Sequence, residues 1–232
     1  MISIMVYQHL GLGDHFICNG LVNYISENPM QKNNTDIFTD IVMPCLSRNI
    51  EAVSYLYRDN KKISLLKVSD DKDHRPEVQA YSQNHNIPIL MIGFYGWETT
   101  PEGWEETFYK QVGLEYFIRY SHFRLPKEPP PTMIKPPQEK YILIHNQCSS
   151  QTFELNIESD LKKIYFEETY PIFSYLELIR GATEIHCVNS AVFHLVESFQ
   201  NLQAKLFFYP IRPDPCRVST KWKTIGKHKT YL

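Results

Sequence analysis

Residues 2–26 read ISIMVYQHLGLGDHFICNGLVNYIS, and this stretch contains three kinds of segment in a row. Residues 2–7 are a short apolar run, which is typical of a buried strand. The glycines of LGLGD, residues 10–14, predict a tight turn. Residues 15–26 then place apolar side chains at helical spacing, and Pro29 ends that helix. A strand, a glycine turn and a helix in this order are the opening of an α/β unit.

The same alternation continues along the chain. Residues 126–137 interrupt it with six prolines, a composition that forms a stiff extended connector. We expect an α/β protein with two Rossmann-like lobes that face each other across a cleft: residues 1–125, a linker over 126–138, and residues 139–232. The predicted strands are 37–43, 63–68, 87–94, 141–145, 185–188 and 206–209, and the predicted helices are 49–58, 76–84, 103–116, 170–180 and 191–200.

The composition excludes several classes of protein. The chain has 232 residues, of which 43% are hydrophobic, and this share is ordinary for a globular protein. A formal net charge of -2 disfavours binding to nucleic acid through bulk charge. The apolar runs are too short to cross a bilayer, and the first residues lack the features of a signal peptide. Five scattered cysteines without a C-x-x-C pair predict a reduced, cytoplasmic protein that has no structural zinc.

Ligands of α/β sheets bind beyond the carboxyl ends of the strands, so the loops after residues 7, 144 and 188 are the candidate sites. The first loop contains Gly11 and Gly13 but has Phe16 where a dinucleotide fingerprint needs a third glycine. The glycine pair lets the backbone approach a ligand closely. Asp14 follows the pair, either as the cap of the helix or as a general base.

The two later loops carry polar side chains. His145, Asn146, Ser149 and Ser150 follow one predicted strand, where they form a polar turn or contact phosphates. Asn189 and Ser190 follow another strand, and each is able to cap the helix that starts near Ala191. His194 lies one turn further on, as a buried histidine or as a ligand contact.

Together these motifs resemble a known family. Leu12-Gly13-Asp14 after the first strand, paired with Asn189-Ser190-Ala191 and then His194-Leu195, resembles the compact GT-B glycosyltransferases and is most similar to the heptosyltransferase-like group. That group has Leu-Gly-Asp and then Asp-Ser/Thr-Gly-x-x-His, so Asn189 and Ala191 depart from its pattern. Residues 104–120 also resemble a stretch of small viral and bacterial glycan-building transferases.

The resemblance implies a metal-independent, inverting glycosyltransferase that moves a sugar from a nucleotide-sugar donor to a glycan or another hydroxyl acceptor. The N-terminal lobe would take the acceptor, with Asp14 as the catalytic base. The C-terminal lobe would take the donor, whose phosphates helix N-termini and basic side chains would meet without a metal or another cofactor. The candidate donor-binding residues are Gly13, His145, Asn146, Ser149, Ser190, Ala191 and His194.

Other hypotheses stay open. Asp71 and Asp73 form the D-x-D pattern with which GT-A transferases hold a divalent cation, although a solvated loop before a helix has the same composition. A non-catalytic module that binds a nucleotide or a sugar is a third hypothesis. The C-terminal tail would contact donor phosphates or an anionic membrane surface, or would simply be solvated. Its residues are Arg212, Arg217, Lys221, Trp222, Lys223, Lys227 and Lys229.

Overall fold

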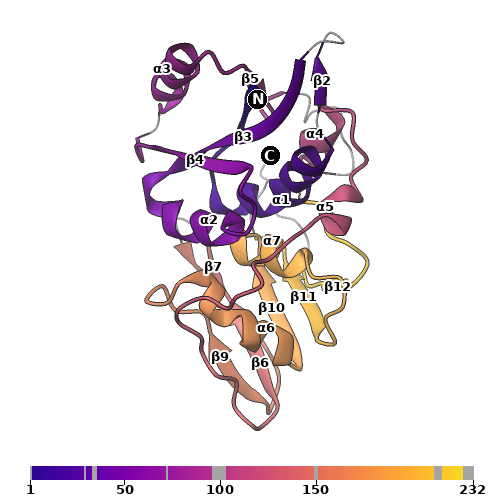
Figure 1. Ribbon diagram of the computed structural model, residues 1–232. Coiled ribbons are helices and arrows are strands. Elements are labelled where there is room, and N and C mark those ends of the chain that lie inside the picture. The colour runs from indigo at the N-terminus through magenta and orange to yellow at the C-terminus, as the bar shows by residue number, and fades with distance from the viewer. Residues whose placement is uncertain are drawn as a thin grey trace. The chain divides into compact units, whose positions relative to one another are not determined.

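The structure is a computed structural model that describes residues 2–28, 30–32, 36–71, 73–95, 103–148, 151–211 and 216–226. The chain divides into two compact units, Met1–Lys127 and Glu128–Leu232, and each unit has its own sheet, mostly parallel in the first and wholly parallel in the second (Figure 1). The predicted α/β class with two Rossmann-like sheets is therefore confirmed. Among the described residues, no helix is long and apolar enough to cross a membrane.

The sheet of the first unit is built around β3 (Asp36–Leu46), its longest strand. On one side β3 pairs with β1 (Ile2–Tyr7), which in turn pairs with β5 (Ile89–Met91), and both pairings are parallel. On the other side the first part of β3 pairs antiparallel with β2 (Met30–Lys32), and the rest pairs parallel with β4 (Ile63–Val68). The chain thus visits β3 and β4 on one side of β1 before it reaches β5 on the other.

Helices cover both faces of this sheet (Figure 1). α3 (Arg75–His85) packs Val78 against Met5, Tyr7 and Val42 on one face. α1 (Leu12–Glu27) contacts β3 and is buried along most of its length. Successive side chains of a strand point to opposite faces, so the two helices use alternate residues of the same strands. The 3-10 turn η1 (Ser47–Asn49), α2 (Ile50–Tyr57), α4 (Glu105–Lys110) and α5 (Ile118–Ser121) complete the unit.

Two predicted elements of this unit are shorter than expected. The helix predicted over 103–116 ends at Lys110, and Gly113 with a φ of 70° follows before α5 begins. The strand predicted over 87–94 ends at Met91, and Gly93 has a φ of 83°. Both glycines adopt a backbone conformation that neither a helix nor a strand contains.

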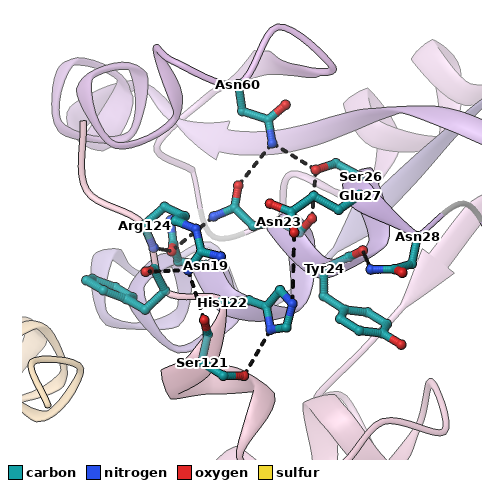
Figure 2. Close-up of polar contacts among 11 residues, drawn as sticks. Asn19, Asn23, Tyr24, Ser26, Glu27, Asn28, Asn60, Ser121, His122 and Arg124 are labelled. Carbon is teal, nitrogen blue, oxygen red and sulfur yellow. Dashed lines mark hydrogen bonds and ion pairs between the residues drawn. The ribbon is translucent and has the colours of Figure 1, made fainter. Parts of the chain in front are cut away.

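A network of polar side chains fixes α1 within the unit (Figure 2). Buried Asn23 donates to Asn19 Oδ1 at 3.2 Å and accepts from Asn60 Nδ2 at 3.0 Å. Asn60, which precedes β4, also donates to Ser26 Oγ at 2.8 Å. Asn19 Oδ1 accepts from the backbone N–H of Arg124 at 2.7 Å. The network ties one helix to two distant segments of the chain.

The second unit has a sheet of five parallel strands in the order β12-β11-β10-β6-β9. The chain starts in the middle at β6, goes to β9 on one side, and returns to β10, β11 and β12 on the other. This is the flavodoxin-like order 2-1-3-4-5. The strands are β6 (Tyr141–His145), β9 (Lys162–Tyr165), β10 (Glu184–Val188), β11 (Lys205–Tyr209) and β12 (Trp222–Thr224).

Helices cover one face of this sheet. α7 (Ala191–Glu197) packs Phe193 on Phe208 of β11 and on Trp222 of β12, with ring centroids 4.6 and 5.0 Å apart. Tyr141 of β6 donates to the carbonyl of Leu178 in α6 (Leu176–Gly181) at 2.8 Å. The 3-10 turn η3 (Ile172–Tyr175) precedes α6. The other face, which includes Ile142, Ile144, Val188 and Tyr209, is covered by Phe153, Leu155, Ile157 and Leu161 from a segment without helix or strand.

Some elements of this unit were not predicted. They are β9, β12 and the short antiparallel pair β7 (Gln147–Cys148) and β8 (Gln151–Thr152). The helix predicted over 170–180 is divided into η3 and α6, and the one predicted over 191–200 ends at Glu197. The segment between residues 126 and 140 contains neither helix nor strand.

Substitution of Asn23 tests the network on α1. We expect Asn23→Ala to lower the free energy of unfolding by about 1–3 kcal/mol, because it removes two hydrogen bonds at a buried site. Asn28→Ala is the matched control, since Asn28 is exposed and its side chain bonds only within the same helix end, to Tyr24 O at 3.0 Å. Urea unfolding of both variants measures the difference. Equal stabilities of the two variants would show that the network contributes little.

Candidate functional site

The loop after β1 lies at the topological switch point of the first sheet. β1 separates β3 and β4 on one side from β5 on the other, so the segments after β1 and β5 leave the sheet next to each other. Open α/β sheets bind ligands at such a point. Residues 8–11 follow β1, and residues 92–95 follow β5.

The backbone of this loop is held in an unusual conformation. Leu10 is fully buried and has a φ of 64°, in the left-handed region that costs a non-glycine residue about 1–2 kcal/mol. The side chain of Gln8 accepts a hydrogen bond from Leu10 N, and Asn49 Nδ2 donates to Leu10 O at 3.1 Å. Strain of this kind persists where the surroundings determine the conformation, often at functional sites.

Asp14 is the third residue of α1. Gly11 is the N-cap residue, with extended φ and ψ of -64° and 150°, so Asp14 lies within the first turn and not at the N-cap position. A Cβ on Gly11 would lie 2.5 Å from Asp14 Oδ2. The glycine therefore lets the carboxylate lie over the start of the helix, where the helix dipole favours its charge. The Asp14 side chain is 12% exposed.

His9 was not among the predicted site residues, although it lies in the same loop. Its Nδ1 is 3.9 Å from Asp14 Oδ1, and its side chain is 39% exposed. Burial lowers the pKa of His9, and a backbone hydrogen bond at Gly93 opposes this shift. The only signal in the sequence was a histidine two residues after a predicted strand.

The second site lies at the switch point of the other sheet, where β6 has β9 on one side and β10 on the other. His145 ends β6, and Ser190 follows β10. Ser190 Oγ and His145 Nδ1 lie 3.0 Å apart, so a hydrogen bond joins the two strand ends. The structure thus brings together two residues that the sequence analysis had placed in separate candidate loops.

The surroundings of this pair set its chemistry. Ser190 is the N-cap residue of α7, and its Oγ accepts from Phe193 N at 3.4 Å. Burial lowers the pKa of His145 to about 4, so its imidazole is neutral at neutral pH. The ring packs edge-on against Phe166 at 5.2 Å. Because one hydrogen lies between the hydroxyl and the neutral imidazole, the pair has one further hydrogen to donate to a phosphate or a sugar.

Solved structures show what this arrangement resembles. TibC from enterotoxigenic E. coli, an iron-containing dodecameric glycosyltransferase, matches with a TM-score of 0.60 at 12% identity, over 99% of this chain and 64% of TibC. TibC in complex with ADP-D-β-D-heptose, where it is described as a heptosyltransferase, gives 0.58 over the same shares. A family 9 glycosyl transferase from Veillonella parvula gives 0.57 at 8% identity, over 96% of this chain and 85% of that protein.

The chain has the fold of a heptosyltransferase-like glycosyltransferase. The fold that the sequence resemblance implied is thereby confirmed. This glycosyltransferase fold is shared at low identity, and the chain spans about 64% of the length of TibC. The sequence matches no protein-family profile and no curated protein.

The remaining predicted donor contacts have separate positions. Gly13 is the second residue of α1, in the first unit. In the second unit, Asn146 donates from its side chain to Phe153 O at 2.7 Å and so closes the β7–β8 hairpin. Ala191 begins α7, and His194 is buried one turn further on, where its backbone N–H donates to Ser190 O at 3.3 Å. Ser149 lies outside the described residues.

The Asp71/Asp73 pair has the features of a solvated loop before a helix. Both residues are exposed, and Asp73 Oδ1 accepts from Arg75 N at 3.3 Å, at the first residue of α3. Within the described part of either unit, taken by itself, no three His, Cys, Asp or Glu side chains gather as a metal site would require.

Part of the basic C-terminal tail is internal structure. Trp222 is buried and donates to Glu197 Oε2 at 2.5 Å, and Lys221 Nζ lies 3.5 Å from the same oxygen. Lys221 also donates to Phe199 O at 2.9 Å, so it closes the end of α7. Trp222 is thus a core residue and not an exposed aromatic among charges. Arg212, Lys227 and Lys229 lie outside the described residues.

The lowered pKa of His145 predicts how stability depends on pH. An unfolded histidine takes up its proton near pH 6.5, whereas folded His145 takes it up only near pH 4. Acidification between these values favours the unfolded state, so stability present above pH 6.5 is lost as the pH falls towards 4. In His145→Gln the loss of stability over this range should be smaller, as measured by urea unfolding. His85→Gln, at an exposed histidine, is the control, and equal slopes in both variants would contradict the prediction.

Proposed function

We propose that the chain is a glycosyltransferase that moves a sugar from a nucleotide-sugar donor to a hydroxyl acceptor. The observation that carries the proposal is the contact between Ser190 and His145 at the switch point of the second sheet, in a fold shared with glycosyltransferases. The complex of TibC with ADP-D-β-D-heptose supports a nucleotide sugar as the donor class.

In this proposal the second unit binds the donor diphosphate. Ser190 Oγ already accepts from Phe193 N, so its own proton can go to His145 Nδ1. The neutral imidazole then carries its hydrogen on Nε2, as a donor to a phosphate oxygen. Ala191, His194, Asn146 and Ser149 stay predicted donor contacts, and so does Gly13 from the first unit.

Asp14 is the proposed general base. It takes the proton of the acceptor hydroxyl while the acceptor oxygen bonds to the anomeric carbon and the bond from that carbon to the diphosphate oxygen breaks. The nucleoside diphosphate leaves with the electron pair. Attack from the face opposite to the leaving group inverts the anomeric carbon. The glycan acceptor and a contact of the basic tail with a membrane surface are further parts of the proposal.

In this proposal hydrogen-bond donors stabilise the negative charge of the diphosphate, and no divalent metal is assigned a role. TibC is described as iron-containing, so the role of a metal needs a direct test. Assays with and without a chelator provide it. Complete loss of activity, restored by manganese or magnesium, would favour the metal-dependent hypothesis with Asp71 and Asp73.

Donor binding can be measured by thermal shift with a panel of nucleotide sugars. A bound donor stabilises the folded state by about 2.7 kcal/mol at a hundredfold excess over its Kd. We expect a shift with at least one donor, and we expect Ala191→Leu to weaken it, because the larger side chain fills the space beside Ser190. Ala204→Leu is the matched control, since Ala204 precedes β11 and so lies at the amino ends of the strands, away from Ser190 at their carboxyl ends. Equal donor affinities of the two variants in calorimetry would exclude the loop after β10 from the donor site.

Asp14→Asn tests the base. Asparagine has nearly the same shape but cannot take the proton, so we expect near-normal melting and donor binding with turnover reduced by at least ~10²-fold. Gly11→Ala should also lower turnover, because its Cβ would displace the Asp14 carboxylate. A wild-type rate in Asp14→Asn would exclude Asp14 as the base. Donor binding without any transfer by the wild type would instead indicate a non-catalytic module.

A further inference from the structure

His9 is held in a cage of aromatic rings in the loop after β1. The centroid of its ring lies 4.8 Å from Phe94, 5.7 Å from Phe108 and 5.9 Å from Trp104. These rings come from the segment after β5 and from the region of α4. The cage leaves the imidazole partly exposed, with Nδ1 3.9 Å from Asp14 Oδ1.

Two glycines make this arrangement possible. A Cβ on Gly11 would lie 2.5 Å from the Asp14 carboxylate, and a Cβ on Gly93 would lie 1.8 Å from the Phe108 ring. Gly93 also has a φ of 83°, which side-chain-bearing residues rarely adopt. Gly11 thus leaves room for the Asp14 carboxylate, and Gly93 leaves room for the Phe108 ring. Both glycines lie close to the end of a strand, Gly11 after β1 and Gly93 after β5.

The contacts of His9 place its ring next to a carboxylate. In the described part of this unit Asp14 of α1 faces His9 Nδ1, three uncharged rings pack around the imidazole, and Gly93 forms a backbone hydrogen bond with it. Burial lowers the pKa of His9, so the ring is neutral before the reaction. A carboxylate at the start of a helix is a weak base, because the dipole stabilises its charge. The stacked ring of Trp104 and the carboxylate of Asp14 would both stabilise an imidazolium once it forms.

We propose that His9 receives at Nδ1 the proton that Asp14 takes from the acceptor hydroxyl. The inference rests on the proposed glycosyltransferase function. The proton moves from the acceptor oxygen to the Asp14 carboxylate, while the nucleoside diphosphate leaves with the electrons of the broken glycosidic bond. It then passes to His9 once the 3.9 Å separation of Nδ1 and Oδ1 shortens to a hydrogen bond in the substrate complex. The imidazolium then releases the proton to solvent through its exposed edge. His9 is a positioning residue that acts through Asp14 and does not touch the substrate.

The pair can be detected without turnover. NMR titration gives the pKa of His9 in the wild type and in Asp14→Asn, with the His9 signal assigned by its absence in His9→Gln. We expect a lower pKa in Asp14→Asn, because the carboxylate at 3.9 Å stabilises the imidazolium. An unchanged pKa would show that the two groups do not interact and would overturn the proposal.

Kinetics test the proton transfer itself. His9→Gln should fold normally and lose about tenfold or more in turnover. The double variant with Asp14→Asn should be no slower than Asp14→Asn alone, because groups that act as one unit give non-additive losses. In the wild type kcat/KM should fall as the pH drops through the His9 pKa, and His9→Gln should shift this limb to lower pH. His85→Gln is the control and keeps the wild-type profile.

The outcomes separate the two proposals. Additive losses, or an acid limb that does not move in His9→Gln, would overturn the role of His9 while the glycosyltransferase function stands. A wild-type protein that binds donors but transfers no sugar would overturn the proposed function and the proton transfer with it. In that case a His9 pKa that still responds to Asp14→Asn would show that the pair exists without this use.

Discussion

Burial of α1 is the constraint on which the first unit depends. Eleven of its sixteen residues are buried, so the helix cannot rotate or slide without exposing apolar surface. The buried asparagines add direction, because Asn23 and Asn19 bond to Asn60 and to the backbone of Arg124 at separate places in the chain (Figure 2). Apolar packing alone tolerates small shifts, whereas these bonds are lost if the helix turns. The position of the first turn of α1 is therefore fixed, and with it the position of Asp14.

The two units reach similar ends by different means. In each, a sheet reverses its direction of growth beside its first strand, and polar groups gather where that strand ends. In the first unit, a carboxylate and an imidazole lie near each other in a loop where Leu10 has a strained backbone and where Gly11 and Gly93 allow close contacts. The second unit needs no strain, because Ser190 caps α7 and contacts His145 in ordinary geometry.

The sequence predicted the elements whose side chains repeat regularly. β4 and β6 have the predicted bounds, and α1 and β10 differ from them by a few residues at most. β9 was missed because Lys-Lys-Ile-Tyr at a sheet edge shows no apolar run, and β12 because Trp222 stands among lysines. Periodicity also cannot show that Gly113 ends a helix or that His9 approaches Asp14. Both features depend on the conformation of loops, which the periodicity of apolar residues does not predict.

The edges of the second sheet have a consequence for handling the protein at high concentration. Among the described residues no strand pairs with the outer side of β9, which begins with Lys162 and Lys163. Lys162 lies 2.7 Å from Glu139, and Lys163 donates to Ile157 O at 2.9 Å. Charged side chains at an edge make it costly for a second molecule to add its own strand there. If apolar residues replaced these lysines, β9 could pair with a strand of another molecule, and the protein would aggregate although its fold is unchanged.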